Sequence, residues 1–423
     1  MPNNTNDQRR IELGTRKDKQ TVVIARTLSD VTNLVTPGTF VLFVKEACEK
    51  DSMLMVSEAI RRGAIGILFE KTGRLDHGIV AASELGVPIT SLNKNIEQLD
   101  TGELYKGVRK LLSEIKNIAD SAPAEENFIP TVHPVKINLG FPITLSKFPA
   151  LSKLVDGVAF ARLEFVITEI IKGEHPLAYI SRTSERKFIS LLAEQLTIIA
   201  KEFSGKPVWF RTDDFCANQL LTLIGGKERE VFEANEYLGW RGIRRSLDQP
   251  SWITLQFLAI KELVDKGFDN IGIFPPMTSS VEEYLQWIKL AEKAGLNSKI
   301  VKFGIMVETP ACALTFEDFT PHLSFVVFGT NDLTQFTLAI DRSNPRLENK
   351  FIENSKAVLA LMKRVITICK ENNIETTVGG QAGFNVDFIK ELLGYGLTGT
   401  SVTPRPATIQ KFKKLFQEYE KNN

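Results

Sequence analysis

Eight short apolar runs, each of strand length, recur between residues 135 and 404 and alternate with longer amphipathic stretches. The runs read VKINL, GVAFARLE, PVWFRT, NIGIFP, KFGIMVE, SFVVFGT, ETTVGG and GTSVTP. Continuous apolar runs are typical of strands that are buried on both faces, as in parallel sheets. The intervening stretches, such as SVEEYLQWIKLAEKAGL, have the spacing of amphipathic helices. Eight strand–helix units in one segment predict an α/β fold, a (β/α)8 TIM barrel over residues 135–418.

A smaller α/β domain is predicted before the barrel, over residues 21–110, from the short apolar runs TVVIA, TFVLFV and AIGILFE. Residues 1–20 are polar and contain no apolar core, so we interpret them as a tail and not as a secretory signal. Residues 111–134 are polar and contain proline, which is typical of a linker.

The charge balance excludes several classes of partner. The chain has 52 basic and 51 acidic side chains, a formal net charge of +1, so nothing in its bulk charge favours nucleic acid or an anionic membrane. No uncharged apolar run approaches the ~18–20 residues that a membrane-spanning helix needs. The four cysteines form no CxxC pair, which argues against a zinc site or a disulfide scaffold and favours a reducing cytoplasm.

Charged and amide side chains gather at the predicted carboxyl ends of the barrel strands, where ligands bind in this fold. The residues at or just after those ends are Arg162, Glu164, Arg211, Glu308, Asn331, Asp332, Gly379, Gly380 and Gln381. Paired carboxylates suit Mg²⁺, and arginines clamp phosphate. One such residue could be only an ion-pair partner within the fold. Their gathering on one rim favours a site for a small phosphorylated acid held on a metal.

A long stretch between the third and fourth strands, residues 213–250, is too long for a simple loop and is interpreted as a functional excursion. Part of it, LGWRGIR (238–244), belongs to a series of motifs that resembles the phosphoenolpyruvate-utilising enzymes. The others are RLEF (162–165), VETP (307–310), GTNDLTQFTLAIDR (329–342) and GGQA (379–382). Within that family the match is closest to phosphoenolpyruvate synthase.

The predicted amino-terminal domain extends the resemblance. TGRLDHGIVAASELGVP (72–88) is similar to the swivelling phosphohistidine domain of the family, and His77 stands where the family has its phosphorylated histidine. Imidazole is a good nucleophile at neutral pH, so the resemblance implies that His77 carries a phosphoryl group. A swivelling carrier domain turns transfer between distant sites into local encounters at high effective concentration.

The resemblance also implies roles for residues of the barrel. Glu308 and Asp332 resemble the Mg²⁺ ligands, and Asn331 a phosphate or carboxylate contact. The substrate-binding residues implied by the motifs are Arg162, Arg211, Arg241, Asn331, Arg342 and Gln381. Members of the family often dimerise through the barrel, so the resemblance further implies a homodimer.

Three departures from the family pattern matter. No stretch resembles the family's ATP-grasp domain, so we expect a separate ATP-grasp subunit. Gly379 stands where the family usually has a cysteine that moves a proton at the methyl carbon of the enolate, and glycine cannot do this. Around His77, Leu75 replaces a threonine that supports the phosphoryl group, and Asp76 adds a negative charge.

Two hypotheses follow. The leading one is a cytoplasmic, Mg²⁺-dependent phosphotransferase with paired acceptors. It would move a phosphoryl group between His77 and a pyruvate-like, enol or phenol acceptor, as one subunit of a split system. The alternative is a degenerate, non-catalytic protein that binds a phosphoenolpyruvate-like ligand or regulates another protein. The altered histidine motif and the missing cysteine favour the alternative, while the retained rim residues favour the enzyme.

Overall fold

The computed structural model describes residues 10–13, 20–25, 31, 40–44, 52–69, 82, 87, 89–91, 106–111, 128–344 and 346–422. The chain divides into two compact units. One comprises residues 1–124 together with 342–348, and the other comprises residues 125–341 and 349–423. Each unit is described by itself. His77, Leu75 and Asp76 lie outside the described residues.

Eight parallel strands of the second unit close into a barrel in the order β10-β11-β12-β13-β6-β7-β8-β9. Each of the eight apolar runs supplies one strand, and almost every strand residue is buried, as continuous apolar runs predict. The finding confirms the predicted (β/α)8 barrel. The strands are β6 (Val135–Leu139), β7 (Val158–Arg162), β8 (Val208–Arg211), β9 (Ile271–Phe274), β10 (Lys302–Val307), β11 (Phe325–Gly329), β12 (Glu375–Gly379) and β13 (Gly399–Val402).

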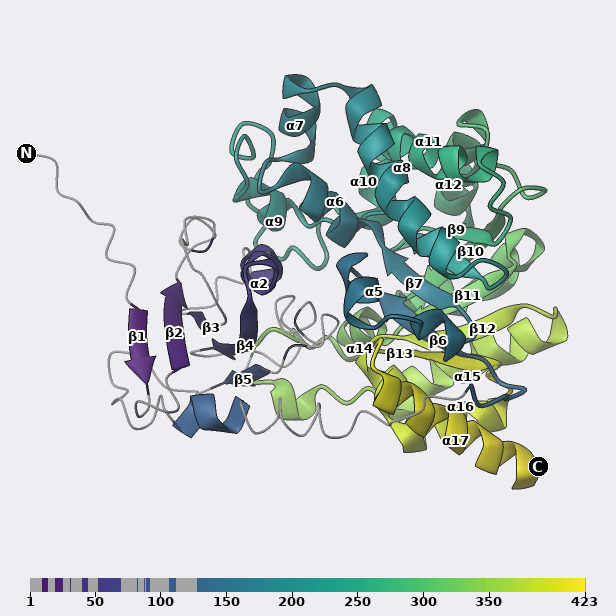
Figure 1. Ribbon diagram of the computed structural model, residues 1–423. Coiled ribbons are helices and arrows are strands. Elements are labelled where there is room, and N and C mark those ends of the chain that lie inside the picture. The colour runs from purple at the N-terminus through teal and green to yellow at the C-terminus, as the bar shows by residue number, and fades with distance from the viewer. Residues whose placement is uncertain are drawn as a thin grey trace, which may run out of the picture. The chain divides into compact units, whose positions relative to one another are not determined.

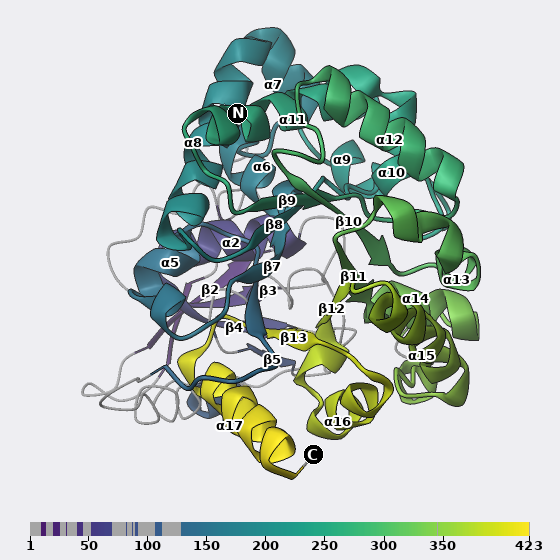
Figure 2. The ribbon, with the colours of Figure 1, turned by 90° about the vertical axis from the view of Figure 1, so that its right-hand side faces the viewer.

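Amphipathic helices surround the strands (Figure 2). Side-chain caps begin several of them: Ser280 and Glu283 form a capping box at α12, and Ser184 caps α8. The helices are α5 (Ile143–Lys147), α6 (Leu163–Ile171), α7 (Pro176–Arg182), α8 (Glu185–Glu202), α9 (Ala217–Leu221), α10 (Gly242–Asp248), α11 (Pro250–Asp265), α12 (Val281–Lys293), α13 (Pro310–Leu314), α14 (Thr330–Leu338), α15 (Lys356–Glu371), α16 (Val386–Tyr395) and α17 (Pro406–Asn422). Short 3-10 turns are η2 (Leu151–Lys153), η3 (Phe316–His322), η4 (Glu348–Lys350) and η5 (Gln381–Phe384).

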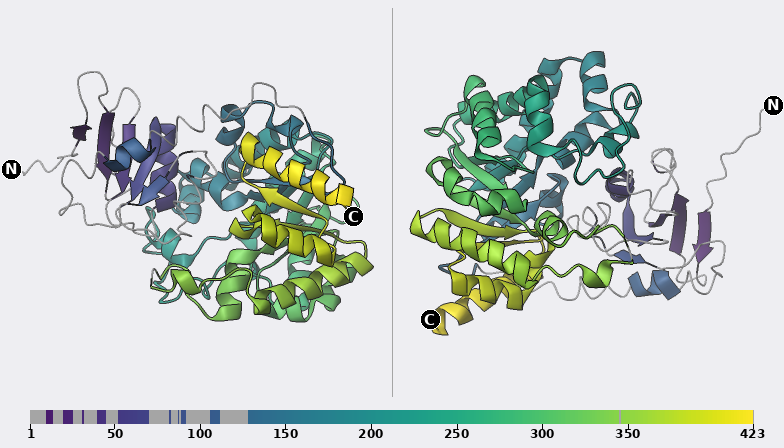
Figure 3. Two further views of the ribbon diagram at one scale, coloured as in Figure 1. Left: turned by 90° about the horizontal axis from the view of Figure 1, so that it is seen from below. Right: turned by 180° about the vertical axis from the view of Figure 1, so that it is seen from behind.

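The last helix, α17, packs against β6, the first strand of the barrel. It ends at the carboxyl terminus (Figure 3, yellow). Buried Lys413 of α17 forms an ion pair with Asp156 and donates a hydrogen bond of 3.1 Å to Thr131. Glu420 accepts from the backbone N–H of His133 at 2.8 Å. These contacts tie the carboxyl-terminal helix to the segment that leads into β6.

The first unit holds a five-stranded sheet in the order β1-β2-β3-β4-β5 (Figure 1, purple). Strands β2 to β5 are parallel, and β1 joins antiparallel to β2. Buried Val22, Val41, Phe43 and Leu68 pack with Leu111 to form its core. This is the small α/β sheet predicted before the barrel. Its elements are β1 (Arg10–Leu13), β2 (Gln20–Ala25), β3 (Phe40–Val44), α2 (Ser52–Arg61), β4 (Ala64–Phe69) and β5 (Ile89–Ser91).

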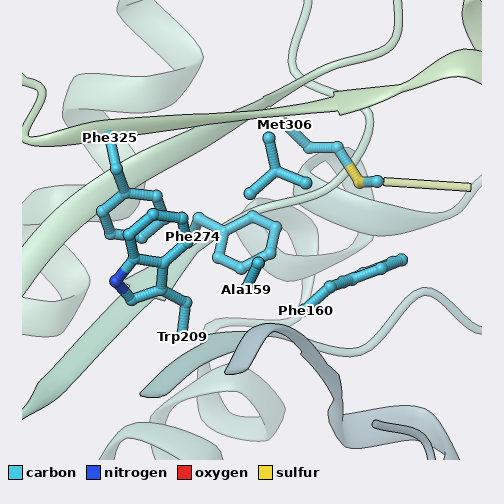
Figure 4. Packing of buried hydrophobic residues seen from close by; sticks show 7 residues of the cluster. Ala159, Phe160, Trp209, Phe274, Met306 and Phe325 are labelled. Atoms are coloured by element: carbon cyan, nitrogen blue, oxygen red, sulfur yellow. The ribbon is translucent and has the colours of Figure 1, made fainter. Parts of the chain in front are cut away.

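Side chains fill the inside of the barrel (Figure 4). One cluster consists of Ala159, Phe160, Trp209, Phe274, Met306, Phe325 and Val327. The rings of Trp209 and Phe325 stack with their centroids 3.9 Å apart. The ammonium group of Lys136 lies 3.7 Å from the Trp209 ring centroid and forms an ion pair with Glu375. A buried cation is thus stabilised both by an aromatic face and by a carboxylate.

Replacing Glu375 with glutamine is expected to destabilise the barrel by ~2–3 kcal/mol, because Lys136 would keep a buried charge without its partner. This value lies below the usual ~3–5 kcal/mol for a buried pair, because 33% of the Glu375 side chain is exposed. Urea unfolding measures the effect. The double variant Lys136→Met/Glu375→Gln should recover most of the loss, because it removes both charges. A single variant that unfolds at the wild-type midpoint would contradict this account.

None of the helices that the structure describes combines the length and apolar character that a membrane span requires.

Candidate active site

Two arginines stand side by side where strands β7 and β8 end. Arg162 and Arg211 are the last residues of their strands and are register partners. Their guanidinium carbons lie 4.7 and 4.8 Å from the centroid of the Phe160 ring, so both cations pack against the same aromatic ring. Glu164, in the first turn of α6, forms an ion pair with Arg211. The structure therefore brings Arg162, Arg211 and Glu164 together at the ends of these two strands.

Asp214 links Arg211 to a second arginine and was not named from the sequence. Arg241 donates to it from Nε at 2.9 Å and from Nη2 at 2.6 Å, a bidentate pair. Nη1 of Arg211 lies 3.2 Å from Asp214 Oδ2. All three side chains are buried. The signal in the sequence was the spacing, since an acid three residues after a strand-end arginine is within reach of it.

The excursion over residues 213–250 folds back onto the rim and delivers Arg241 there. Asn218 exchanges two hydrogen bonds, of 2.8 and 2.9 Å, with the backbone of Glu233. Oε1 of Glu233 accepts from the backbone N–H of Trp240 at 2.8 Å. A Cβ at Gly239 would lie 1.9 Å from Glu233 Oε2, so any other residue there would displace the Glu233 carboxylate from its bond to Trp240. The predicted functional excursion is thus a folded arm that ends at the site.

A buried network holds the same arm from its other side. Glu230 accepts from His175 Nε2 at 2.9 Å and forms a two-point ion pair with Arg245 of α10. Burial raises the pKa of Glu230, but hydrogen bonds from His175 and Arg245, together with their charges, outweigh it and leave that pKa below its ordinary value. Glu230 is therefore an anion that anchors the start of α10, where Arg241 lies.

A carboxylate pair occupies the β10 and β11 side of the rim. Glu308 follows β10, and its Oε1 accepts from the backbone N–H of Met277 at 2.6 Å. Its Oε2 is buried and has no hydrogen-bond partner among the described residues. Asp332, in the first turn of α14, lies 3.5 Å from Nη1 of Arg241. Burial, and then the charges of Asp332 and Asp214, raise the pKa of Glu308 to about 8.

Backbone geometry explains how Glu308 is held. Met277 has φ of +61°, a left-handed conformation that turns its N–H toward the carboxylate. Gly242, at φ +60°, approaches so closely that a side chain there would lie 2.8 Å from Met277 Cβ. At Gly329 a side chain would lie 2.6 Å from Glu308 Oε2. Two glycines of the sequence motifs are therefore required by the packing around one carboxylate.

The described rim holds one more carboxyl group than guanidinium group. Three guanidiniums, from Arg162, Arg211 and Arg241, face four carboxylates, a formal charge of −1 when all are ionised. The carboxylates are Glu164, Asp214, Glu308 and Asp332. The raised pKa of Glu308 favours its protonated form near neutral pH, so the metal-free rim has little net positive charge to attract an anionic ligand, and a bound cation would supply that charge. The orphaned Glu308 oxygen and the raised pKa of Glu308 fit a hard divalent cation such as Mg²⁺.

The carboxylates available as ligands on the rim fit Mg²⁺ in a specific way. No group of three or more histidine, cysteine, aspartate or glutamate side chains able to hold a metal occurs in the described part of the chain. Mg²⁺ is commonly bound through one or two carboxylates, with water and ligand phosphate oxygens completing its shell. Glu308 and Asp332 match this pattern, in which the ligand helps to hold the ion.

Thr330 joins the β11 and β12 sides of the rim. Its hydroxyl lies 2.9 Å from Glu353 Oε1 and 3.3 Å from the carbonyl oxygen of Gly379. The neighbouring Asn331 has a buried Oδ1 that has no hydrogen-bond partner among the described residues. Neither Thr330 nor Glu353 was predicted from the sequence. Thr330 directly follows β11, whereas Glu353 lies between η4 and α15 and has no strand-end signal.

The structure describes the remaining predicted site residues in less detail. Gln381 is the first residue of η5, directly after Gly380 at φ +90°, and its side chain lies outside what the structure describes. Arg342 follows α14 by four residues and lies in the 342–348 segment that groups with the first unit. His77 is outside the described residues. Cys312 is fully buried in α13.

Comparison with known proteins identifies the family of the chain. Residues 121–420 match the family model of the PEP-utilising enzyme, PEP-binding domain, where PEP is phosphoenolpyruvate. The chain belongs to the PEP-utilising enzymes. Phosphoenolpyruvate synthase of Pyrococcus furiosus is 35% identical over 380 residues, which cover 86% of this chain and 46% of that protein. The probable phosphoenolpyruvate synthase of Pyrococcus abyssi is 36% identical over 382 residues, with 86% and 46% covered.

A third relative, the phosphoenolpyruvate synthase of Helicobacter pylori, is 28% identical over 409 residues, with 86% of this chain and 49% of that protein covered. The chain therefore spans about half the length of the curated relatives that it matches. Among solved structures, a malate synthase lead(II) complex of Haloferax volcanii aligns with a TM-score of 0.34 at 12% identity, over 54% of this chain and 60% of that one. That similarity is too low to support an argument.

Proposed function

We propose that the barrel binds phosphoenolpyruvate or a similar small phosphorylated acid and exchanges its phosphoryl group with His77. The observation that carries the proposal is the rim, where Arg162, Arg211 and Arg241 lie next to a carboxylate pair with an orphaned oxygen. The protein is then a phosphotransferase with paired acceptors, of the phosphoenolpyruvate-synthase type.

The charges of the rim suggest how transfer is helped. Phosphoryl transfer depends mainly on positioning and on charge stabilisation, because the transition state spreads charge over the phosphoryl oxygens. Arg162 and Arg211 would hold those oxygens, and Arg241 and Asn331 would orient the ligand. Glu308 and Asp332 would hold Mg²⁺, which supplies positive charge when bound. We place Arg342 and Gln381 in the same substrate-binding set.

The phosphoryl source is proposed to be a nucleotide-binding ATP-grasp domain outside these 423 residues, supplied by the other subunit of a split system. We further propose that the enzyme is cytoplasmic and forms a homodimer. The similarity to phosphoenolpyruvate synthases supports a relay through a carrier histidine. The chain covers 46% of the Pyrococcus furiosus protein, so more than half of that relative has no counterpart in these 423 residues.

A radiolabel experiment tests the carrier role. The purified protein is mixed with Mg²⁺ and phosphoenolpyruvate labelled in its phosphoryl group, and separately with labelled ATP and candidate ATP-grasp partners. We expect an acid-labile label that is absent from the His77→Gln variant. Absence of label in every mixture would reject the carrier role of His77. If calorimetry still showed ligand binding, the second candidate would stand: a non-catalytic protein that binds a phosphoenolpyruvate-like ligand.

Restoring a thiol at Gly379 separates pyruvate from other acceptors. A Cβ at this position would lie 3.1 Å from Val327 Cγ1 and 3.5 Å from Phe160 Cδ1, so Gly379→Cys fits after a shift of a few tenths of an ångström. If pyruvate is the acceptor, the variant should exchange the methyl protons of pyruvate faster than the wild type does, by roughly 10²–10⁴-fold. Proton NMR in deuterated buffer measures this exchange. No gain, in a variant that still binds pyruvate, would favour a different acceptor.

A further inference from the structure

The inside of the barrel has a polar side below Gly379. On β12, Glu375 reaches Lys136, whose ammonium lies over the ring of Trp209 inside the barrel. Side chains two residues apart share a face of a strand, so Thr377 points inward and Gly379 faces the same interior. A Cβ at Gly379 would indeed meet Phe160 and Val327, which belong to the interior cluster. Thr377 therefore lies directly below Gly379.

Two further polar groups adjoin this position from β13 and β6. The Ser401 hydroxyl lies 2.6 Å from Asn138 Oδ1 and 2.9 Å from the carbonyl oxygen of Val378, in the peptide that leads into Gly379. A serine hydroxyl has one proton, so it can donate to only one of these two oxygens at a time. When it donates to Val378, Asn138 Oδ1 can accept a hydrogen bond from another group.

One hydroxyl in this group has no partner. Thr377 Oγ1 is buried, the residue is 1% exposed, and no hydrogen bond reaches that oxygen from the described residues. Leaving a buried hydroxyl unsatisfied costs free energy, so such a group in a functional barrel points to a missing partner. Asn138 and Ser401 are also buried, at 2% and 0% exposed. The three residues, Thr377, Asn138 and Ser401, are called the polar subsite below.

The opposite side of the interior is apolar. Phe160, Phe274, Met306 and Val327 come from β7, β9, β10 and β11 (Figure 4). On the rim above, the charged groups also come from β7 to β11 and from the arm. The charged groups of a bound ligand would therefore lie on that side. Its remaining, uncharged end faces β12, β13 and β6, where the polar subsite lies.

We propose that the polar subsite hydrogen-bonds a hydroxyl group on the uncharged end of the acceptor, so that the preferred acceptor is a hydroxylated 2-oxo acid and not pyruvate. The proposal rests on the proposed function of the rim. A methyl group at this position would leave the Thr377 hydroxyl unsatisfied, whereas a hydroxyl could accept from it and donate to Asn138. A site built to bond a substrate hydroxyl discriminates strongly against the analogue that lacks it.

The test compares two probes that differ by one hydroxyl, pyruvate and 3-hydroxypyruvate. Each is titrated calorimetrically, with Mg²⁺ present, into the wild type and into Thr377→Val, which has the same shape without the hydroxyl. We expect the wild type to prefer 3-hydroxypyruvate, and Thr377→Val to lose roughly 2–10-fold of that preference, as for one hydrogen bond. Its affinity for pyruvate should change less than its affinity for 3-hydroxypyruvate, because pyruvate has no hydroxyl to bond Thr377. Its melting temperature should not fall, because an unsatisfied buried hydroxyl is removed.

Thr376→Val is the matched control on the other face of β12. Thr376 bonds Thr398, so this variant should lose stability but keep the wild-type preference. A wild type that binds both probes equally, or a Thr377→Val variant with an unchanged preference, would overturn the polar subsite while leaving the rim intact. If neither pyruvate, 3-hydroxypyruvate nor phosphoenolpyruvate binds in the presence of Mg²⁺, the proposed function fails together with the subsite.

Discussion

Replacing Glu308 with glutamine is expected to weaken the Mg²⁺-dependent binding of phosphoenolpyruvate by at least ~100-fold, because even residues that only support metal ligands cost 10–100-fold when changed. The fold should survive. The carboxylate is buried close to Asp332 and Asp214, and both charges disfavour its ionised form. Its neutral amide analogue should therefore leave the melting temperature of the metal-free protein unchanged or higher.

The measurement pairs calorimetry of phosphoenolpyruvate, with Mg²⁺ present, with thermal unfolding in EDTA. Glu317→Gln serves as control, because Glu317 forms only an exposed pair with Arg364 and should change neither quantity. A Glu308→Gln variant that bound the ligand as the wild type does would remove Glu308 from the metal site. A variant that unfolded during purification would instead show that Glu308 supports the fold.

The second large effect is expected at Arg241. Its replacement by methionine removes both bonds to Asp214 and the contact with Asp332, which leaves two buried carboxylates with one cation fewer. We expect a loss of ~3–5 kcal/mol in the free energy of unfolding, the usual cost of breaking a buried ion pair. The arm over residues 213–250 would also lose its attachment to the rim, so the affinity for phosphoenolpyruvate should fall by at least ~100-fold.

Arg244→Met, three residues along α10, is the matched control. Arg244 is half-buried and donates only one hydrogen bond of 3.3 Å, to Ser279. Its replacement should change the free energy of unfolding by no more than ~0.5 kcal/mol. Urea unfolding and calorimetry on both variants decide the matter. If Arg241→Met and Arg244→Met had the same free energy of unfolding and the same affinity for phosphoenolpyruvate, the network through Asp214 would have no special role.

The barrel itself could be predicted because its strands are buried on both faces and so appear as continuous apolar runs. The same runs indicate where each strand ends, and these ends predict that Arg162, Arg211, Glu308 and Asp332 lie near one rim, where the structure has them. Strand ends are local features of the sequence. Their meeting at one face follows from the parallel topology alone.

Other parts of the site depend on contacts that no local pattern reveals. Arg241 was named only through the resemblance to a family, because its place on the rim requires the whole arm to fold back. Asp214 was missed, although it joins Arg211 to Arg241. The bond from the Met277 N–H to Glu308 depends on a left-handed residue that is not glycine, which sequence patterns do not indicate.

The central claim is that the rim binds a phosphorylated acid only together with a divalent cation. Titration of phosphoenolpyruvate into the wild-type protein, with Mg²⁺ and then with EDTA, tests it most directly. Since four carboxylates face three described guanidiniums, we predict binding with Mg²⁺ and an affinity at least ~100-fold lower in EDTA. The same affinity in both buffers, or no binding in either, would contradict the account.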